Sequence, residues 1–214
     1  MISSTLLLLL QLLSPVLLSE ADSHGCRLPE MRKELDVERL SNTSWYTGLQ
    51  TNDITASAIT CVRFSNFTST TSGFRVIITE HGDRLVQFEN YFNYVKDGIY
   101  RISKSDKELD HAEYVRELNG PDENTVLRID HVIADENQVF LTDYKNYIAG
   151  FICPPDPTFD NEHRFVWGFF PSPNPTLSQI AAFMNVLHDA GISTHFHSST
   201  CSETNWSQSL QIPK

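Results

Sequence analysis

The fold is decided by one stretch, Thr142-Asp143-Tyr144-Lys145-Asn146-Tyr147-Ile148-Ala149-Gly150-Phe151-Ile152-Cys153, which encodes a strand end, a tight turn and a second strand. Before the turn, successive side chains alternate between two faces. One face carries Val139, Leu141 and Asp143, and the other carries Phe140, Thr142 and Tyr144. The alternation resumes after Lys145-Asn146. Alternation on both sides of a short turn is typical of an antiparallel hairpin.

Further strands are predicted on both sides of this hairpin, each bounded by turn residues. The candidate strands are 45–51, 59–68, 74–80, 85–95, 99–103, 126–134, 139–144, 147–153 and 164–170. Strands in series that are followed by one late helix indicate an antiparallel β architecture. The pattern alone leaves a closed barrel and a two-layer sandwich both open.

The late helix is predicted between Thr176 and Gly191. Thr176 and Gln179 have the spacing of a capping box, and Gly191 is the expected stop. An apolar stripe at helical spacing consists of Ile180, Phe183, Met184 and Leu187. We expect this stripe to pack on the outside of the sheet.

The first residues indicate export. An apolar block runs from Leu6 to Leu18, but polar residues and a proline interrupt it, and it is short for a membrane span. Ser19-Glu20-Ala21 then places small residues three and one positions before a cut. This arrangement is typical of a secretory signal peptide. We therefore expect residues 1–21 to be removed and residues 22–214 to form one extracellular domain with no membrane span.

The charge balance argues against a nucleic-acid partner. The chain has 16 basic and 27 acidic residues, and loss of Glu20 with the signal peptide leaves 27 − 1 = 26 acidic residues and a net charge near −10. Such a surface repels nucleic acid and anionic lipid. Enzyme activity is not expected either, because the sequence has no nucleophile elbow, zinc-protease motif or phosphate loop. No cofactor is required by any motif.

Covalent modifications are suggested by two further patterns. An even number of cysteines in an exported chain suggests two disulfides, although the sequence permits three pairings of Cys26, Cys61, Cys153 and Cys201. Three sequons are candidate glycosylation sites and start at Asn42, Asn66 and Asn205. Each of them requires a surface position.

The chain resembles the lipocalins, small secreted β-barrels that carry apolar ligands. The resemblance is carried by Leu35-Asp36-Val37 leading to Trp45-Tyr46, by Thr142-Asp143-Tyr144, by Arg164-Phe165-Val166-Trp167, and by the capped helix followed by Cys201. These motifs occur in the family's order over nearly all of the mature chain. The resemblance implies an all-β fold, an eight-stranded antiparallel up-and-down β-barrel with one C-terminal α-helix packed outside.

The resemblance is strongest to the apolipoprotein D and insect bilin-binding branch. It implies the disulfides Cys26–Cys153 and Cys61–Cys201. One departure concerns the floor of the barrel, because Pro171 or Ser172 stands where the family has a basic residue that packs on the first tryptophan. The floor must therefore be closed in another way.

The resemblance also places a ligand inside the barrel. If Cys153 and Cys61 point outward to the two tails, alternation turns their neighbours inward. The expected lining is Thr60, Val62, Phe64, Val139, Leu141, Ile148, Gly150, Ile152, Trp167 and Phe169. This lining suits a small hydrophobic molecule such as a bilin, carotenoid, sterol, retinoid or fatty acid. No metal site is expected, because His195 and His197 lack an evident third ligand.

Several alternatives remain open at this point. The inward residues can simply fill a dry core, or the barrel can hold a pigment for display. A lipid isomerase would use Cys61 as a thiolate, which a disulfide would exclude. A surface-acting extracellular inhibitor would not need the interior. A homodimer is also left open.

Overall fold

The computed structural model describes residues 27–52, 56, 59–82, 85–102, 136–153 and 165–206. Three sequence predictions lie outside the described residues: the signal peptide over 1–21, the position of Cys26 and the candidate strand 126–134. Within the described part of the chain, no helix is long and apolar enough to cross a membrane.

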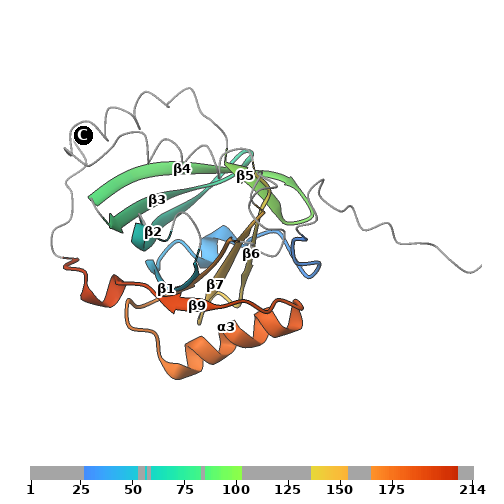
Figure 1. The fold of residues 1–214 in the computed structure, drawn as a ribbon. Coiled ribbons are helices and arrows are strands. Elements are labelled where there is room, and N and C mark those ends of the chain that lie inside the picture. Colours follow the sequence, from blue (N-terminus) through green and yellow to red (C-terminus); the bar gives the residue numbers. More distant parts are fainter. Residues whose placement is uncertain are drawn as a thin grey trace, which may run out of the picture.

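Eight antiparallel strands form a closed barrel (Figure 1). They are β1 (Trp45–Thr51), β2 (Ile59–Thr70), β3 (Gly73–Gly82), β4 (Leu85–Lys96), β5 (Ile99–Ile102), β6 (Gln138–Thr142), β7 (Ile148–Ile152) and β8 (Phe165–Phe170). Each strand pairs with the next one in the chain, and β1 pairs with both β2 and β8, which closes the ring. The predicted up-and-down barrel is therefore confirmed.

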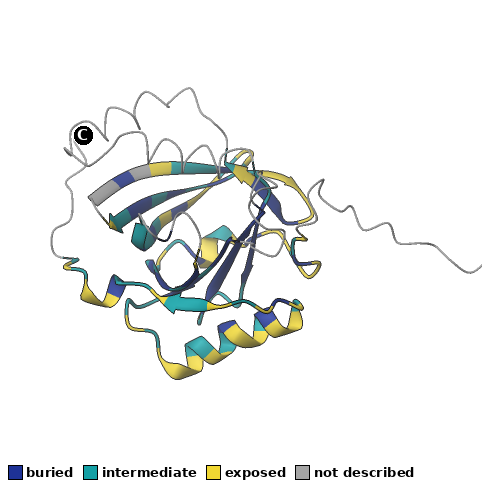
Figure 2. Cartoon of the chain, viewed as in Figure 1, coloured by how far each residue is buried: buried dark blue, intermediate teal, exposed yellow. Residues whose placement is uncertain are grey.

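The helix α3 (Leu177–Asp189) packs outside this barrel. Its first turn is fixed by the predicted capping box, in which Thr176 and Gln179 exchange hydrogen bonds between side chain and backbone. Phe183 and Leu187 are buried, and each contributes roughly 1.5–3 kcal/mol of apolar burial. Met184 is 43% exposed, so it does not belong to the packed face. Figure 2 shows that most of α3 outside these contacts is exposed.

An extra strand, β9 (Phe196–Ser198), lies outside the eight and pairs with β1. β1 pairs with β2 through Trp45 and Tyr46, and with β9 through Leu49, Gln50 and Thr51. Just after β9, the N–H of Thr200 donates to the carbonyl of Thr60 in β2 at 2.9 Å. The C-terminal segment therefore connects β1 to β2 at the end of the barrel where β2 begins.

The core has two parts, one on each face of the barrel wall. The inner cluster includes Trp45, Phe74, Phe92 and Ile148. The outer cluster joins the wall to α3 and includes Val166, Phe170, Phe183 and Leu187. Strands that are buried on both faces, such as β7, run between the two clusters. Figure 2 shows these strands as buried along their length.

The segment before β1 closes one end of the barrel. It contains the short 3-10 helix η1 (Val37–Arg39), and the flanking Leu35 and Leu40 are buried in the inner cluster. The backbone N–H of Asp36 donates to the hydroxyl of Tyr144 at 2.9 Å, and the guanidinium of Arg39 lies 4.0 Å from the centre of the same ring. Tyr144 therefore contacts the floor segment through both its hydroxyl and its ring.

The turn between β6 and β7 is fixed by Asp143. Its carboxylate accepts hydrogen bonds from the backbone N–H groups of Lys145 at 2.9 Å and Asn146 at 2.7 Å. Tyr144 adopts a left-handed backbone with φ of 64°. Burial acts to raise the pKa of Asp143, but the hydrogen bonds from Asn146 and Lys145 outweigh it and hold the pKa below its usual value. The ionised carboxylate of Asp143 thus stabilises the turn of the predicted hairpin.

Candidate functional site

Most of the residues expected to line the interior lie on the inner face. Phe64, Ile148 and Phe169 belong to the inner cluster, and the partly buried Val62 and Trp167 pack against it. A Cβ atom at Gly150 would lie 3.6 Å from the ring of Phe140 and 3.7 Å from that of Phe169, so Gly150 also faces inward. Ile152 alternates with Cys153 and is only 1% exposed. Contact of these residues with a ligand stays a prediction.

Val139 and Leu141 do not face the interior, so this part of the predicted lining is wrong. Both belong to the outer cluster with Phe183, and Phe140 holds the inward position on β6. The error has a physical cause. β6 is buried on both faces, so the hydrophobicity of its residues does not distinguish the inner face from the outer one.

The expected inward position of Thr60 is also wrong. The register between β2 and β3 shifts between Ile59 and Cys61, which marks a bulge. The hydroxyl of Thr60 instead contacts the hydroxyl of Thr200 at 2.8 Å, on the C-terminal segment that also carries Cys201. The bulge turns Thr60 toward the same side as Cys61.

The half of the interior next to the floor is filled with aromatic rings. The members are at most 6% exposed and are Phe64, Phe67, Phe74, Phe92, Tyr100, Phe140 and Phe169. Ring centres are 4.4 Å apart for Phe64 and Phe169 and 4.8 Å apart for Phe74 and Phe92. Such distances are typical of packed aromatic pairs. This half is therefore a packed core. A ligand could contact Phe64 and Phe169, as expected from the sequence, only by displacing the rings that already pack against them.

One continuous row of paired residues crosses the inner wall of the barrel and the adjacent β9. In register, the row runs through His197 in β9, Gln50 in β1, Trp167 in β8, Gly150 in β7 and Phe140 in β6. Cross-strand partners share a face of the sheet. Trp167 is only partly buried, and its cross-strand neighbour Gly150 has no side chain. We define these residues as the tryptophan row.

The buried polar side chain of the tryptophan row is Gln50, which is 3% exposed. Its side-chain Nε2 lies 3.5 Å from the carbonyl oxygen of Ile59 and 3.3 Å from Nε2 of His197. Sequence alternation from Trp45 would place Gln50 on the outer face. The register shift between Thr47 and Leu49 moves it to the inner face, so alternation could not have found this residue.

Cys61 is bonded to Cys201 in a disulfide that spans a sequence separation of 140. This predicted pairing is confirmed, and the isomerase interpretation that needs a Cys61 thiolate is wrong. Cys153 is also disulfide-bonded. Because Cys26 lies outside the described residues, the pairing Cys26–Cys153 stays a prediction.

The disulfide fixes the C-terminal segment against the outer wall. Trp206 packs edge-on against the rings of Tyr46 at 4.9 Å and His81 at 4.8 Å. The guanidinium carbon of Arg63 lies 5.1 Å from the centre of the Trp206 ring. Burial and the charge of Arg63 lower the pKa of His81, so its neutral form is favoured beneath this cover.

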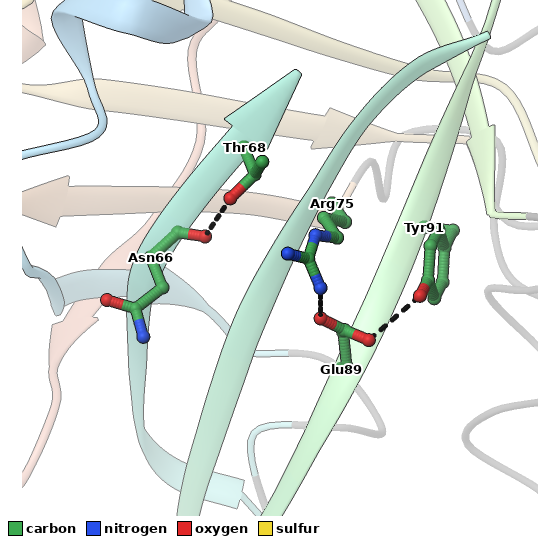
Figure 3. A network of polar contacts seen from close by, with 5 residues as sticks. All are labelled: Asn66, Thr68, Arg75, Glu89 and Tyr91. Atoms are coloured by element: carbon green, nitrogen blue, oxygen red, sulfur yellow. Dashed lines mark hydrogen bonds and ion pairs between the residues drawn. The ribbon is translucent and has the colours of Figure 1, made fainter. Parts of the chain in front are cut away.

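The three sequon asparagines, Asn42, Asn66 and Asn205, are all exposed. Asn66 has a φ of 54° and lies in the irregular stretch of β2 between Ser65 and Thr68. Figure 3 shows it beside an outer-face network in which Arg75 pairs with Glu89 and the hydroxyl of Tyr91 donates to Glu89 at 2.8 Å. Glycosylation at the three sites stays a prediction.

A separate cavity of about 500 Å³ lies at the floor of the barrel. The segment from Glu34 to Glu38, the turn from Ser69 to Gly73, Tyr94 and Tyr100 line it. None of the residues predicted to bind a ligand is among them. In the described part of the chain, no group of three or more His, Cys, Asp or Glu side chains is placed to hold a metal ion.

Comparisons with solved structures show what this geometry is similar to. The chain matches the cockroach major allergen Per a 4 with a TM-score of 0.56 at 14% identity, over 85% of this chain and 99% of that one. Apocrustacyanin C2 matches with a TM-score of 0.51 at 16% identity, and lobster apocrustacyanin A1 with 0.51 at 15%. Both of these cover 77% of this chain and 78% of their own.

The comparison with family models gives no match, and neither does the comparison with curated protein sequences. The structural matches establish the lipocalin fold that the sequence motifs predicted. Membership of the apolipoprotein D and bilin-binding branch stays a prediction.

Proposed function

We propose that this protein binds a small apolar molecule in the half of the barrel away from the floor, and that it sequesters or transports this molecule outside the cell. The observation that carries the proposal is the tryptophan row. Trp167 offers a partly buried ring on the inner face, and its cross-strand neighbour Gly150 presents no side chain. The surrounding inner residues, Val62 and Ile152, are apolar. Burial of apolar ligand surface against such a wall supplies the binding free energy.

Two further observations support the proposal. The barrel is closed and carries one helix outside, which is the lipocalin arrangement. The Cys61–Cys201 disulfide is of the kind that persists in oxidising compartments, which agrees with export. The aromatic packing near the floor limits the proposed site to the other half, so the ligand contacts would come from Val62, Gly150, Ile152 and Trp167 rather than from Phe64 or Phe169.

The experiment compares two tryptophan variants in titrations with N-phenyl-1-naphthylamine, a neutral apolar dye whose fluorescence rises on burial. Trp167→Ala should weaken binding by about 1–3 kcal/mol, because it removes the largest apolar surface of the proposed site. Trp206→Ala is the matched control, since Trp206 packs on the outer wall against Tyr46 and His81. An unchanged dissociation constant in Trp167→Ala would remove Trp167 from the site. A visible absorption band in natively purified protein would identify the guest as a pigment.

A further inference from the structure

Trp206 is attached to the outer wall through contacts of its ring. Its indole N–H donates to the carbonyl of Cys201 at 3.1 Å, which lies within the C-terminal segment itself. On the wall, the centre of the ring lies 4.9 Å from that of Tyr46, 4.8 Å from that of His81 and 5.1 Å from the guanidinium carbon of Arg63. The disulfide anchors the segment at Cys201. The chain after Cys201 can therefore leave the wall while the disulfide stays intact.

Two side chains beneath this ring each carry a buried polar atom that has no hydrogen-bond partner. The atoms are Nε of Arg63 and Nε2 of His81. Arg63 donates through Nη2 to the hydroxyl of Thr79 at 3.2 Å, but among the described residues no carboxylate pairs with its charge. Polar atoms of this kind are more stable when water reaches them. A second positive charge beneath Trp206 would therefore be strongly disfavoured.

The protonation state of His81 decides whether that second charge is present. In a neutral imidazole one ring nitrogen carries no proton, so Nε2 can remain buried as a bare acceptor. Protonation turns both ring nitrogens into donors, and Nε2–H would then be a charged donor without an acceptor, near the Arg63 cation. Departure of Trp206 would let water reach both groups and remove this penalty.

The other charges around this contact do not offset a charge on His81. The titratable and charged groups on the packed elements are Tyr46 on β1, Arg63 on β2, Glu80 on β3, Glu89 on β4 and Glu203 in the 3-10 helix η2 (Cys201–Glu203). Alternation turns Glu80 to the inner face, Glu89 pairs with Arg75, and Glu203 is exposed. Residues 83–84 lie outside the described residues. Within the described part, the charge that acts on His81 is that of Arg63.

We propose that protonation of His81 releases the chain after Cys201 from the outer wall, so that Trp206 covers this wall at neutral pH and leaves it in acid. Burial, and after it the charge of Arg63, lowers the pKa of His81 from its ordinary value of 6.5. The covered form thus binds the proton less readily than the released form. The cover is complete above pH 6.5 and weakens as the pH falls below it. This inference does not depend on the proposed ligand site.

The test is 19F NMR of the protein labelled with 5-fluorotryptophan. The chain has three tryptophans, and the Trp206 resonance is identified by its absence in Trp206→Phe. Between about pH 7.5 and 5, this resonance should move toward its position in the denatured protein, with at most about a tenfold change in the ratio of covered to released protein per pH unit. The resonance of Trp45, which is 1% exposed, should stay in place. In His81→Gln, the Trp206 resonance should no longer respond to pH in this range.

The matched control is His188→Gln, because the His188 side chain is 90% exposed on α3 and its loss should leave the pH response unchanged. A Trp206 resonance that does not move with pH in the wild type would overturn the inference, and so would a response that persists in His81→Gln. If His81→Gln does not fold, as judged by circular dichroism, the 15N shifts of the His81 ring are followed in the wild type. Midpoints of the His81 and Trp206 titrations that differ by more than about one pH unit would then overturn the inference.

Discussion

The hydroxyl of Tyr100 accepts a hydrogen bond from the backbone N–H of Leu35 at 2.9 Å, across a sequence separation of 65 residues. The contact is buried, because Tyr100 is 2% exposed and Leu35 is 8% exposed. Tyr144 makes the equivalent contact with the next backbone N–H, that of Asp36. Two tyrosine hydroxyls on the barrel therefore hold the segment that forms its floor. The Tyr100 hydroxyl also satisfies a buried backbone donor, which would otherwise lose its hydration without compensation.

Removal of the Tyr100 hydroxyl should destabilise the protein. Tyr100→Phe keeps the ring among its aromatic neighbours but leaves the N–H of Leu35 without an acceptor, so the free energy of unfolding should fall by about 1–3 kcal/mol. Urea unfolding followed by tryptophan fluorescence measures this change. Tyr94→Phe is the control, because Tyr94 is 39% exposed and its ring centre lies 5.6 Å from that of Tyr100. Equal effects of the two substitutions would contradict the assignment.

Stability should also depend on the ionisation of Tyr100 at high pH. Burial raises the pKa of Tyr100 from 10.0 to about 12, and the hydrogen bond from Leu35 only partly offsets this rise. Below pH 10 the hydroxyl is protonated in both the folded and unfolded states, and its contribution is complete. Between pH 10 and 12 the unfolded state loses the proton first, so about 2–3 kcal/mol of stability should be lost.

The measurement for this pH dependence is the free energy of unfolding from pH 9 to 12 in the wild type and in Tyr100→Phe. The difference between the two proteins isolates Tyr100 from other tyrosines such as Tyr147, whose pKa burial also raises. The difference should shrink as the pH rises through this window. A difference that stays constant would show that the pKa of Tyr100 is the same in both states.

The elements that depend on local sequence could be predicted well. β1 matches the predicted range 45–51, and the α3 capping box at Thr176 forms as expected. Turn chemistry, capping and alternation act over a few residues, so they can be read without knowledge of the rest of the chain. The resemblance to lipocalins then predicted that the sheet closes into a barrel. The strand pattern alone did not distinguish a barrel from a sandwich.

The faces of the strands could be predicted only where alternation is regular. Bulges displaced Thr60 from the interior and moved Gln50 into it, and neither bulge has a sequence signal of its own. On β6 both faces are buried, so hydrophobicity did not reveal which residues face inward. Val139 was expected on the inner face, but Phe140 lies there. His197 lies beside Gln50 because β9 pairs with β1, and no local sequence pattern encodes this long-range contact.

The disulfide between Cys61 and Cys201 should contribute strongly to stability. It ties the C-terminal segment to β2 across 140 residues, and removal of a native disulfide costs about 2–5 kcal/mol. The double variant Cys61→Ala/Cys201→Ala should unfold at correspondingly lower guanidinium concentration. Thiol titration of the unreduced, denatured wild type should find no free thiol, as the isomerase alternative would require one. Detection of two free thiols would show that one predicted bridge does not form.

Gly168 is expected to be intolerant of any side chain, because it lies beneath the helix. A Cβ atom at this position would approach the ring of Phe183 to 2.9–3.1 Å, closer than ordinary contact allows. Gly168→Ala must therefore push Phe183 and α3 away from the barrel, at a cost of about 1–3 kcal/mol in urea unfolding.

Gly150 supplies the matched control on the neighbouring strand. A Cβ atom there would meet its neighbours at 3.6–3.7 Å, which is ordinary contact, so Gly150→Ala should be neutral or stabilise the fold by up to about 1 kcal/mol. The double variant Gly168→Ala/Phe183→Leu should lose less stability than the two single costs combined, because the smaller side chain relieves the clash. If the two changes in the free energy of unfolding simply add in the double variant, a clash with Phe183 is not the reason that position 168 requires a glycine.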